Sequence, residues 1–283
     1  MSKVNRMKTS WFGRSAYVPP PVADGPRLVA EEVTLGYDKR VISSDLSVEI
    51  PDGSFTVIIG PNACGKSTLL RALSRLLPPE KGSVLLDGAE IASLPAKEVA
   101  RRLGLLPQTS TAPDGIRVAD LVARGRFPHQ SLIRQWSADD ETAVAEAMAS
   151  TRVDALSGRL VDELSGGQRQ RVWIAMVLAQ QTPLVLLDEP TTYLDIAHQI
   201  ELLDLCAELN RSGRTLVAVL HDLNHAFRYA DHLVVMKDGA IVAQGAPGEI
   251  VDAALIDEVF SLPCRIIDDP ESHTPLVVPR VRR

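Results

Sequence analysis

The sequence predicts an α/β fold that combines a parallel-sheet core with an antiparallel β part and an inserted helical part. Two short, continuously apolar runs, 184–188 and 215–220, have the composition of central parallel strands that are covered on both faces. The turn dipeptides Asp87-Gly88 and Asp238-Gly239 each separate two apolar runs and indicate hairpins at both ends of the chain. An alanine-rich stretch with a helical pattern lies between these ends, from about 118 to 160.

The first strands are expected to follow one another closely. The apolar or β-branched segments are 28–35, 46–50 and 55–59, and Pro51-Asp52-Gly53 marks the turn between the last two. The first expected hairpin joins 82–86 to Ile91, and the second joins 232–236 to 240–243. These segments supply both the antiparallel part and one edge of the core.

Three helical segments are expected between the strands. They are 66–77, which Pro78-Pro79 ends, then about 118–160 with a loop around 124–135, and finally 165–180. We therefore expect a single domain over 28–280, with a helical subdomain at about 110–180 inserted in the core. Residues 1–27 are polar and basic and contain Pro19-Pro20-Pro21, which predicts a flexible, unpacked tail.

The composition is that of a globular protein with a sizeable core. Of 283 residues, 45% are hydrophobic and 23% charged, and the net charge of −6 argues against a nucleic-acid partner. The widely spaced Cys64, Cys206 and Cys264 form no metal or disulfide pattern and fit a reduced, cytosolic setting. No apolar run approaches the roughly 18 residues of a membrane span, and the N-terminus lacks the apolar stretch of a secretory signal. Any membrane association is therefore expected to come through a partner.

A phosphate-binding pattern, G-x-x-x-x-G-K-[ST], follows the strand at 55–59 and opens the next helix. It consists of Gly60, Pro61, Asn62, Ala63, Cys64, Gly65, Lys66, Ser67 and Thr68. Backbone N–H groups and a helix N-terminus together attract phosphate. Lys66 is expected to reach the β- and γ-phosphates of ATP, and Ser67 to ligate Mg²⁺. The alternative, a chance glycine turn, does not account for the flanking strand and helix.

A pair of carboxylates follows the apolar strand at 184–188 and gives a Walker B pattern. Asp188 ends the strand at the edge where α/β sheets bind ligands, and Glu189 follows directly. We expect Asp188 to hold Mg²⁺ through water and Glu189 to orient or polarise the attacking water. Taken alone this signal is weak, because many ordinary strands end in acidic residues.

A short glycine motif precedes the helix expected at 165–180. Its residues are Leu164, Ser165, Gly166, Gly167 and Gln168. The spacing of the serine and the glutamine fits a capping box, and the glycines would expose backbone donors to a phosphate. With this motif, the sequence over roughly 28–280 resembles the ABC (ATP-binding cassette) ATPases. The resemblance implies a P-loop NTPase core of the RecA-like type, and a homodimer in which each copy's motif completes its partner's ATP site.

The same resemblance implies roles for four further residues. Tyr37 would stack on adenine, Gln108 would sense Mg²⁺ and water, Asp195 would lie at the dimer interface, and His221 would contact the γ-phosphate. Simple packing is the alternative for Tyr37, and a structural role is the alternative for His221. Because Glu189 and His221 are both present, the resemblance implies a site that hydrolyses ATP.

A cassette without membrane spans implies two separate permease subunits and, indirectly, an extracytoplasmic substrate-binding protein. The implied location is the cytoplasmic face of the inner membrane, as a peripheral subunit. Arg124-Gly-Arg-Phe-Pro-His129, within 118–130, is similar to the ATPases of ferric-siderophore importers, a group that also takes up haem and vitamin B12. The segments 191–199 and 274–279 are similar to the same group. The alternative is that these are generic surface loops, and the cargo assignment rests on resemblance alone because the ATPase does not touch the cargo.

Other functions fit less well. A non-transport ABC protein of DNA repair or of the ribosome would carry two cassettes or a long coiled-coil insertion, and an inactive regulatory module would not need Glu189 and His221. Importers of amino acids, metals or lipids and, less readily, an exporter cassette remain open. Cys64 is expected to be a small filler, or else a reactive thiol whose pKa is lowered by the helix N-terminus, so that alkylation would block ATP.

Overall fold

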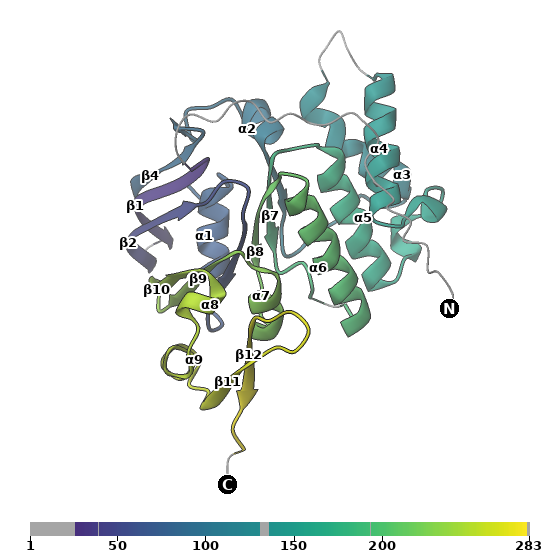
Figure 1. The fold of residues 1–283 in the computed structure, drawn as a ribbon. Helices are drawn as coiled ribbons and strands as arrows, with labels where there is room; N and C mark the ends of the chain where they lie inside the picture. Colours follow the sequence, from purple (N-terminus) through teal and green to yellow (C-terminus); the bar gives the residue numbers. More distant parts are fainter. Residues whose placement is uncertain (1–25, 39, 131–135, 193, 282–283) are drawn as a thin grey trace, which may run out of the picture.

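The structure, a computed structural model, describes residues 26–38, 40–130, 136–192 and 194–281. It forms a central sheet with an antiparallel sheet on one side and a group of helices on the other (Figure 1). Of the expected N-terminal tail, 1–27, the described residues include only Pro26 and Arg27. Arg27 is buried and its Nε lies 2.7 Å from an oxygen of Asp87. The prediction of an unpacked tail is therefore wrong at its last residue, because this ion pair ties it to the domain.

Six strands form the central sheet in the order β10-β9-β3-β8-β7-β6. Their bounds are β3 (Phe55–Ile59), β6 (Leu103–Leu106), β7 (Leu184–Asp188), β8 (Thr215–Val219), β9 (His232–Lys237) and β10 (Ala240–Gly245). All neighbours are parallel except β10, which returns antiparallel to β9 through the predicted hairpin. The prediction of a parallel core is confirmed.

A four-stranded antiparallel sheet, ordered β2-β1-β4-β5, lies beside the core. Its strands are β1 (Leu28–Tyr37), β2 (Arg40–Ile50), β4 (Lys81–Leu86) and β5 (Ala89–Glu90). The predicted turn at Asp87-Gly88 is confirmed, since Leu86 pairs with Ala89 across it. A two-stranded hairpin, β11 (Cys264–Asp268) with β12 (Pro275–Pro279), lies near the C-terminus and was not predicted.

The helices fall into three groups along the chain. They are α1 (Lys66–Leu73) and α2 (Ala96–Arg102); then α3 (Val118–Ala123), η1 (Arg124–His129), α4 (Ala138–Ser150), η2 (Asp154–Leu156), η3 (Val161–Glu163) and α5 (Gly166–Ala179); and then α6 (Ile196–Arg211), α7 (Leu223–Tyr229), α8 (Pro247–Ile250) and α9 (Ala253–Phe260). The helix expected at 66–77 ends four residues early, because Arg75 turns into the left-handed region with φ +66°. In the described residues, no helix has the length and apolar character required to cross a membrane.

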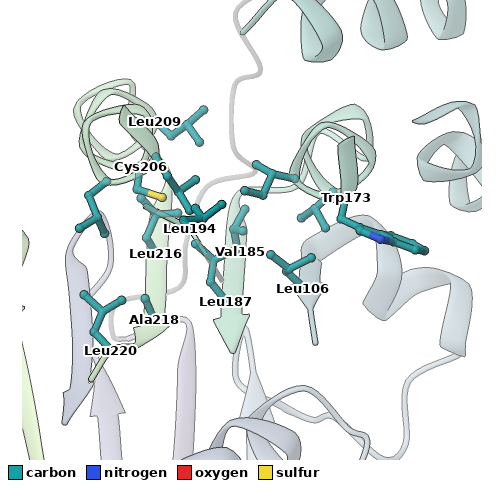
Figure 2. Close-up of a cluster of buried hydrophobic side chains, with 14 of the residues drawn as sticks. Leu106, Trp173, Val185, Leu187, Leu194, Cys206, Leu209, Leu216, Ala218 and Leu220 are labelled. Carbon is teal, nitrogen blue, oxygen red and sulfur yellow. The ribbon is translucent and has the colours of Figure 1, made fainter. Parts of the chain in front are cut away.

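Both faces of the central sheet are buried. In β7, Leu184 and Leu186 pack toward α1, whereas Val185 and Leu187 point to the opposite face. Figure 2 shows this second face, where Val185 and Leu216 lie beneath side chains such as Cys206 of α6, and Trp173 of α5 lies to one side beyond Leu106. Because neither face meets water, these strands read as continuous apolar runs in the sequence.

The expected loop at 124–135 begins instead with the 3-10 helix η1, and its residues 131–135 lie outside the described part. Two contacts hold η1 against α5. A Cβ on Gly125 would lie 2.1 Å from the carbonyl oxygen of Met176, so the two backbones are in direct contact. Arg126 is buried, pairs with Asp140 of α4 at 2.8 Å and donates to the carbonyl of Ala179 at 2.8 Å. A loop was predicted because no local pattern reveals these tertiary contacts.

Candidate active site

The phosphate-binding loop joins the end of β3 to the start of α1, as the sequence predicts. Gly60 has φ +157°, and a Cβ there would lie 2.2 Å from the carbonyl oxygen of Met236, so the close approach requires glycine. Gly65 precedes α1 in the left-handed region, with φ +106°. Lys66 is buried, and its Nζ donates to the carbonyls of Gly60 and Pro61 at 2.8 Å each. The loop therefore curls around its own ammonium group, an arrangement that suits an anion.

A cleft of about 470 Å³ opens over this loop. It is lined by the loop residues Asn62, Ala63, Gly65, Lys66, Ser67 and Thr68, by Gln108, Glu189 and His221, and by Arg40 and Ile42 of β2. Arg40 and Ile42 were not predicted as site residues, because this strand was expected to begin at residue 46. Their spacing of two, which puts both on one side of a strand, is the signal that could have found them.

Glu189 lies at the centre of a hydrogen-bonded group in the cleft. Its Oε1 lies 2.7 Å from Nε2 of His221, and its Oε2 accepts a hydrogen bond from Nε2 of Gln108 at 2.8 Å. The three side chains follow the carboxyl ends of β6, β7 and β8, which are neighbours in the sheet. Glu189 itself has φ +52°, a strained conformation for a non-glycine residue. The fold thus fixes both oxygens of this carboxylate beside the phosphate-binding loop.

The neighbouring carboxylate, Asp188, fits a magnesium ion. Ser67 Oγ donates to Asp188 Oδ1 at 2.9 Å, and Asp188 is buried. Burial raises the pKa of Asp188, although the hydrogen bond from Ser67 opposes the rise. A cation bound beside Asp188 would lower this pKa again, because an opposite charge favours the ionised carboxylate. Mg²⁺ commonly takes only one or two protein oxygens and completes its shell with water and phosphate. In the described part of the chain, no group of three or more His, Cys, Asp or Glu side chains could hold a metal.

Tyr37 does not line the cleft. It lies at the end of β1 with 41% of its surface exposed, and its hydroxyl accepts a hydrogen bond from Arg71 at 3.3 Å. The turn that joins β1 to β2 places it close to Arg40, with which it pairs across the two strands.

The glycine motif also lies away from the cleft of its own chain. The capping box is confirmed, since Ser165 Oγ accepts from the backbone of Gln168 at 3.3 Å and the Gln168 side chain accepts from the backbone of Ser165 at 3.2 Å. Ser165 and Gly166 are exposed at the start of α5. Asp195 is exposed as well, and caps α6 through the backbone N–H of His198 at 3.0 Å. Ser165, Gly166 and Asp195 are therefore accessible to a second molecule.

Of the two interpretations of Cys64, the reactive thiol with a lowered pKa is wrong. The residue is only 5% exposed, and its burial raises the pKa of the thiol, outweighing the effects of Lys66 and of the backbone N–H groups. A Cβ on Gly60 would lie 2.7 Å from its Sγ, so the thiol fills the inside of the loop. Cys64 therefore matches the small-filler interpretation, because a buried and protonated thiol reacts slowly.

Comparison with known proteins places these features in a family. The family model described as "ABC transporter" matches residues 43–192, more than half of the chain. The ferric enterobactin transport ATP-binding protein FepC of Escherichia coli (strain K12) is 61% identical over 254 residues, which cover 89% of this chain and 94% of that protein. A solved metal-chelate type ABC transporter in an inward-facing conformation has a TM-score of 0.77 at 27% identity, over 91% of this chain and 98% of that one. The dimeric cassette MJ0796 has a TM-score of 0.69 at 26% identity, over 77% of this chain and 98% of that one.

Proposed function

Because the chain belongs to the ABC transporter family, as an ATP-binding cassette with ATPase activity, we propose that it powers the import of ferric siderophores. The observation that supports ATP hydrolysis is the position of the Glu189 carboxylate, which contacts His221 and Gln108 beside the phosphate-binding loop. The cargo part is supported by the 61% identity to a ferric enterobactin transport protein. Haem, vitamin B12 or another importer cargo is the alternative.

The residues of the cleft divide the chemistry among them. The loop N–H groups and Lys66 bind the phosphates. The Glu189 carboxylate orients the attacking water and acts as the general base that accepts its proton. His221 and Gln108 hold the two oxygens of that carboxylate in place. Ser67 and Asp188 would hold Mg²⁺, which neutralises developing charge on the phosphate oxygens when bound.

A second copy of the chain completes each site. At the start of α5, the Ser165 hydroxyl and the backbone N–H groups of Gly166 and Gly167 would donate to the γ-phosphate bound by the partner. Asp195 is exposed and would lie at the interface with the partner. The dimeric state of the related cassette MJ0796 supports this arrangement. Closure of the pair is then driven by the tighter binding of ATP to the closed state.

The permease contact is supported by Phe127, an aromatic side chain that is 62% exposed on a rigid support. Its neighbours are fixed, since Arg126 is buried and Arg101 Nε donates to the carbonyl of Pro128 at 2.8 Å. A preorganised aromatic loses little freedom on binding and is a common anchor of interfaces. We place one permease subunit at η1 of each copy in the dimer, so that two permease subunits are bound. This makes the protein a peripheral subunit at the cytoplasmic face of the inner membrane. A substrate-binding protein would act only through the permease.

Phe127→Ala should lower uptake by about tenfold or more, because a buried interface anchor contributes about 2 kcal/mol. The ATPase rate of the purified protein should stay within about twofold, since Phe127 lies away from the cleft. Leu76→Ala is the matched control, because Leu76 is an apolar side chain of similar exposure, 61%, that follows α1 and is not part of η1. Uptake at the wild-type rate in Phe127→Ala would rule out η1 as the contact.

The proposed function is tested by uptake of radioactive iron from ferric siderophores under iron limitation. Cells that carry Glu189→Gln should lose uptake of one siderophore, and cells that carry Glu49→Gln, at an exposed position of β2, should not. Unchanged uptake with every siderophore would remove the siderophore assignment. Uptake of vitamin B12 and haem would then be measured in the same cells.

A further inference from the structure

The short helix α7 directly follows His221. Only His221 and its neighbours Leu220 and Asp222 separate β8 from α7, and Asp222 caps the helix by accepting from the backbone of His225 at 2.8 Å. A helix of seven residues makes too few internal hydrogen bonds to be stable by itself. The position of α7, and with it that of His221, therefore depends on what the helix packs against.

The inner side of α7 is anchored in the core and on α6. Ala226 and Phe227 are fully buried, and Tyr229 donates its hydroxyl hydrogen to Asp204 of α6 at 2.8 Å. Asn224 and Arg228 are four positions apart and so share another side of the helix. This side faces the C-terminal hairpin, and Figure 1 shows β12 immediately below α7.

Asn224 pairs with the backbone of β12 as a neighbouring strand would. Its Oδ1 accepts from the N–H of Val277 at 2.8 Å, and its Nδ2 donates to the carbonyl of the same residue at 3.4 Å. Val277 is buried at 6% exposure. One side chain thus satisfies both backbone groups of a buried strand residue and fixes the start of α7 to the hairpin.

Arg228 makes a second attachment one turn further along. It donates to Asp269 Oδ2 at 2.5 Å, and Asp269 is only 4% exposed. The other oxygen, Oδ1, accepts from the backbone of Glu271 at 2.9 Å and of Ser272 at 3.4 Å, so Asp269 also shapes the hairpin turn. The hydrogen bond from Arg228 holds the pKa of Asp269 well below its usual range, so the pair stays charged at neutral pH.

We propose that Asn224 and the Arg228–Asp269 pair are positioning residues for ATP hydrolysis, because they clamp α7 to the C-terminal hairpin and so fix His221 against Glu189. The inference rests on the role that the proposed function gives to His221. The side chain of His221 is 45% exposed, so the packing around its ring constrains it weakly. Its 2.7 Å contact with Glu189 is then set by the backbone that the clamp holds.

The first test compares Asn224→Ala and Asp269→Asn with the wild-type full-length protein. In each variant kcat for ATP should fall about tenfold, since displacing a reacting group by about 1 Å can cost up to about a hundredfold. KM for ATP should stay within about twofold, because the phosphate-binding loop lies on α1 and not on α7. Asp268→Asn is the matched control: Asp268 is 70% exposed beside His273, and its variant should keep the wild-type kcat.

The second test repeats both substitutions in a His221→Ala protein. If the clamp acts through His221, neither should lower kcat further, because residues that act through one group are not additive. A further drop of similar size, or wild-type kcat in both single variants, would overturn the clamp alone. Unchanged kcat in His221→Ala itself would overturn both the clamp and the proposed role of His221. Thermal unfolding establishes that each variant is folded at the assay temperature. If Asn224→Ala does not fold, Asp269→Asn alone tests the proposal, because it keeps the shape of the side chain.

Discussion

Glu189→Gln should lower the ATPase kcat of the purified protein by about 10²–10⁴-fold, which is the usual contribution of a positioned general base. The amide keeps the shape of the side chain but cannot accept a proton from water at neutral pH. ATP should still bind with similar affinity, because Lys66 and the loop N–H groups are untouched. The substituted protein is therefore expected to accumulate as an ATP-bound dimer.

The measurement combines steady-state phosphate release with size-exclusion chromatography in the presence of ATP and Mg²⁺. Glu163→Gln is a suitable control, because Glu163 is an exposed carboxylate of η3. Turnover at the wild-type rate in Glu189→Gln would contradict the role given to Glu189. Loss of ATP binding would instead show that the substitution disturbs the strained backbone at this position.

Arg126→Met should destabilise the protein by about 3–5 kcal/mol, the usual cost of leaving one partner of a buried ion pair alone. The Asp140 carboxylate would remain buried, and the carbonyl of Ala179 would lose a donor. Burial raises the pKa of Asp140, but hydrogen bonds from Arg126 and Ser137 outweigh it, and the net pKa lies below the ordinary value. The contribution of the pair is therefore present at neutral pH and is lost as pH falls below the usual carboxylate range.

Urea unfolding followed by circular dichroism measures this difference. The double variant Arg126→Met/Asp140→Leu should recover part of the loss, since it leaves no unpaired buried charge. Ser137 would still accept from the backbone of residue 140, but the hydrogen bonds from Ser137 to the Asp140 carboxylate would be lost. Arg159→Met is the control, because its ion pair with Glu163 is exposed. An Arg126→Met protein within about 1 kcal/mol of wild type would show that water reaches the remaining carboxylate.

The strands of the core could be predicted because their environment is simple. In β7 and β8 every residue is buried, so the apolar runs in the sequence directly reflect the two covered faces. The capping box of Ser165 and Gln168 is a local pattern and could be predicted for the same reason. By contrast, Gln108, Glu189 and His221 lie far apart in the sequence, and only their resemblance to a family, not their spacing, indicated that they meet.

What could not be predicted depends on tertiary contacts. The start of β2 carries a mixture of polar and apolar side chains, so the strand was predicted to begin only at residue 46, and Arg40 and Ile42 were left outside it. The hairpin of β11 and β12 contains prolines and is held by α7, a contact that no local pattern encodes. At Cys64 the alternative of a pKa lowered by the helix N-terminus fails, because the desolvation of the buried thiol is the larger effect and is not visible in the sequence.

The strand order of the central sheet has a consequence for synthesis of the chain. In β3, Phe55 pairs with Leu216 on one side and Thr56 pairs with His232 on the other, so β3 acquires its neighbours only after most of the chain has been made. Parallel pairing between such distant segments closes long loops and is intrinsically slow, and it leaves apolar strands exposed in the nascent chain. A fragment released from the ribosome after α5 would therefore be prone to aggregate, because it has the phosphate-binding sequence but lacks β8 and β9, the central-sheet strands that pair with β3.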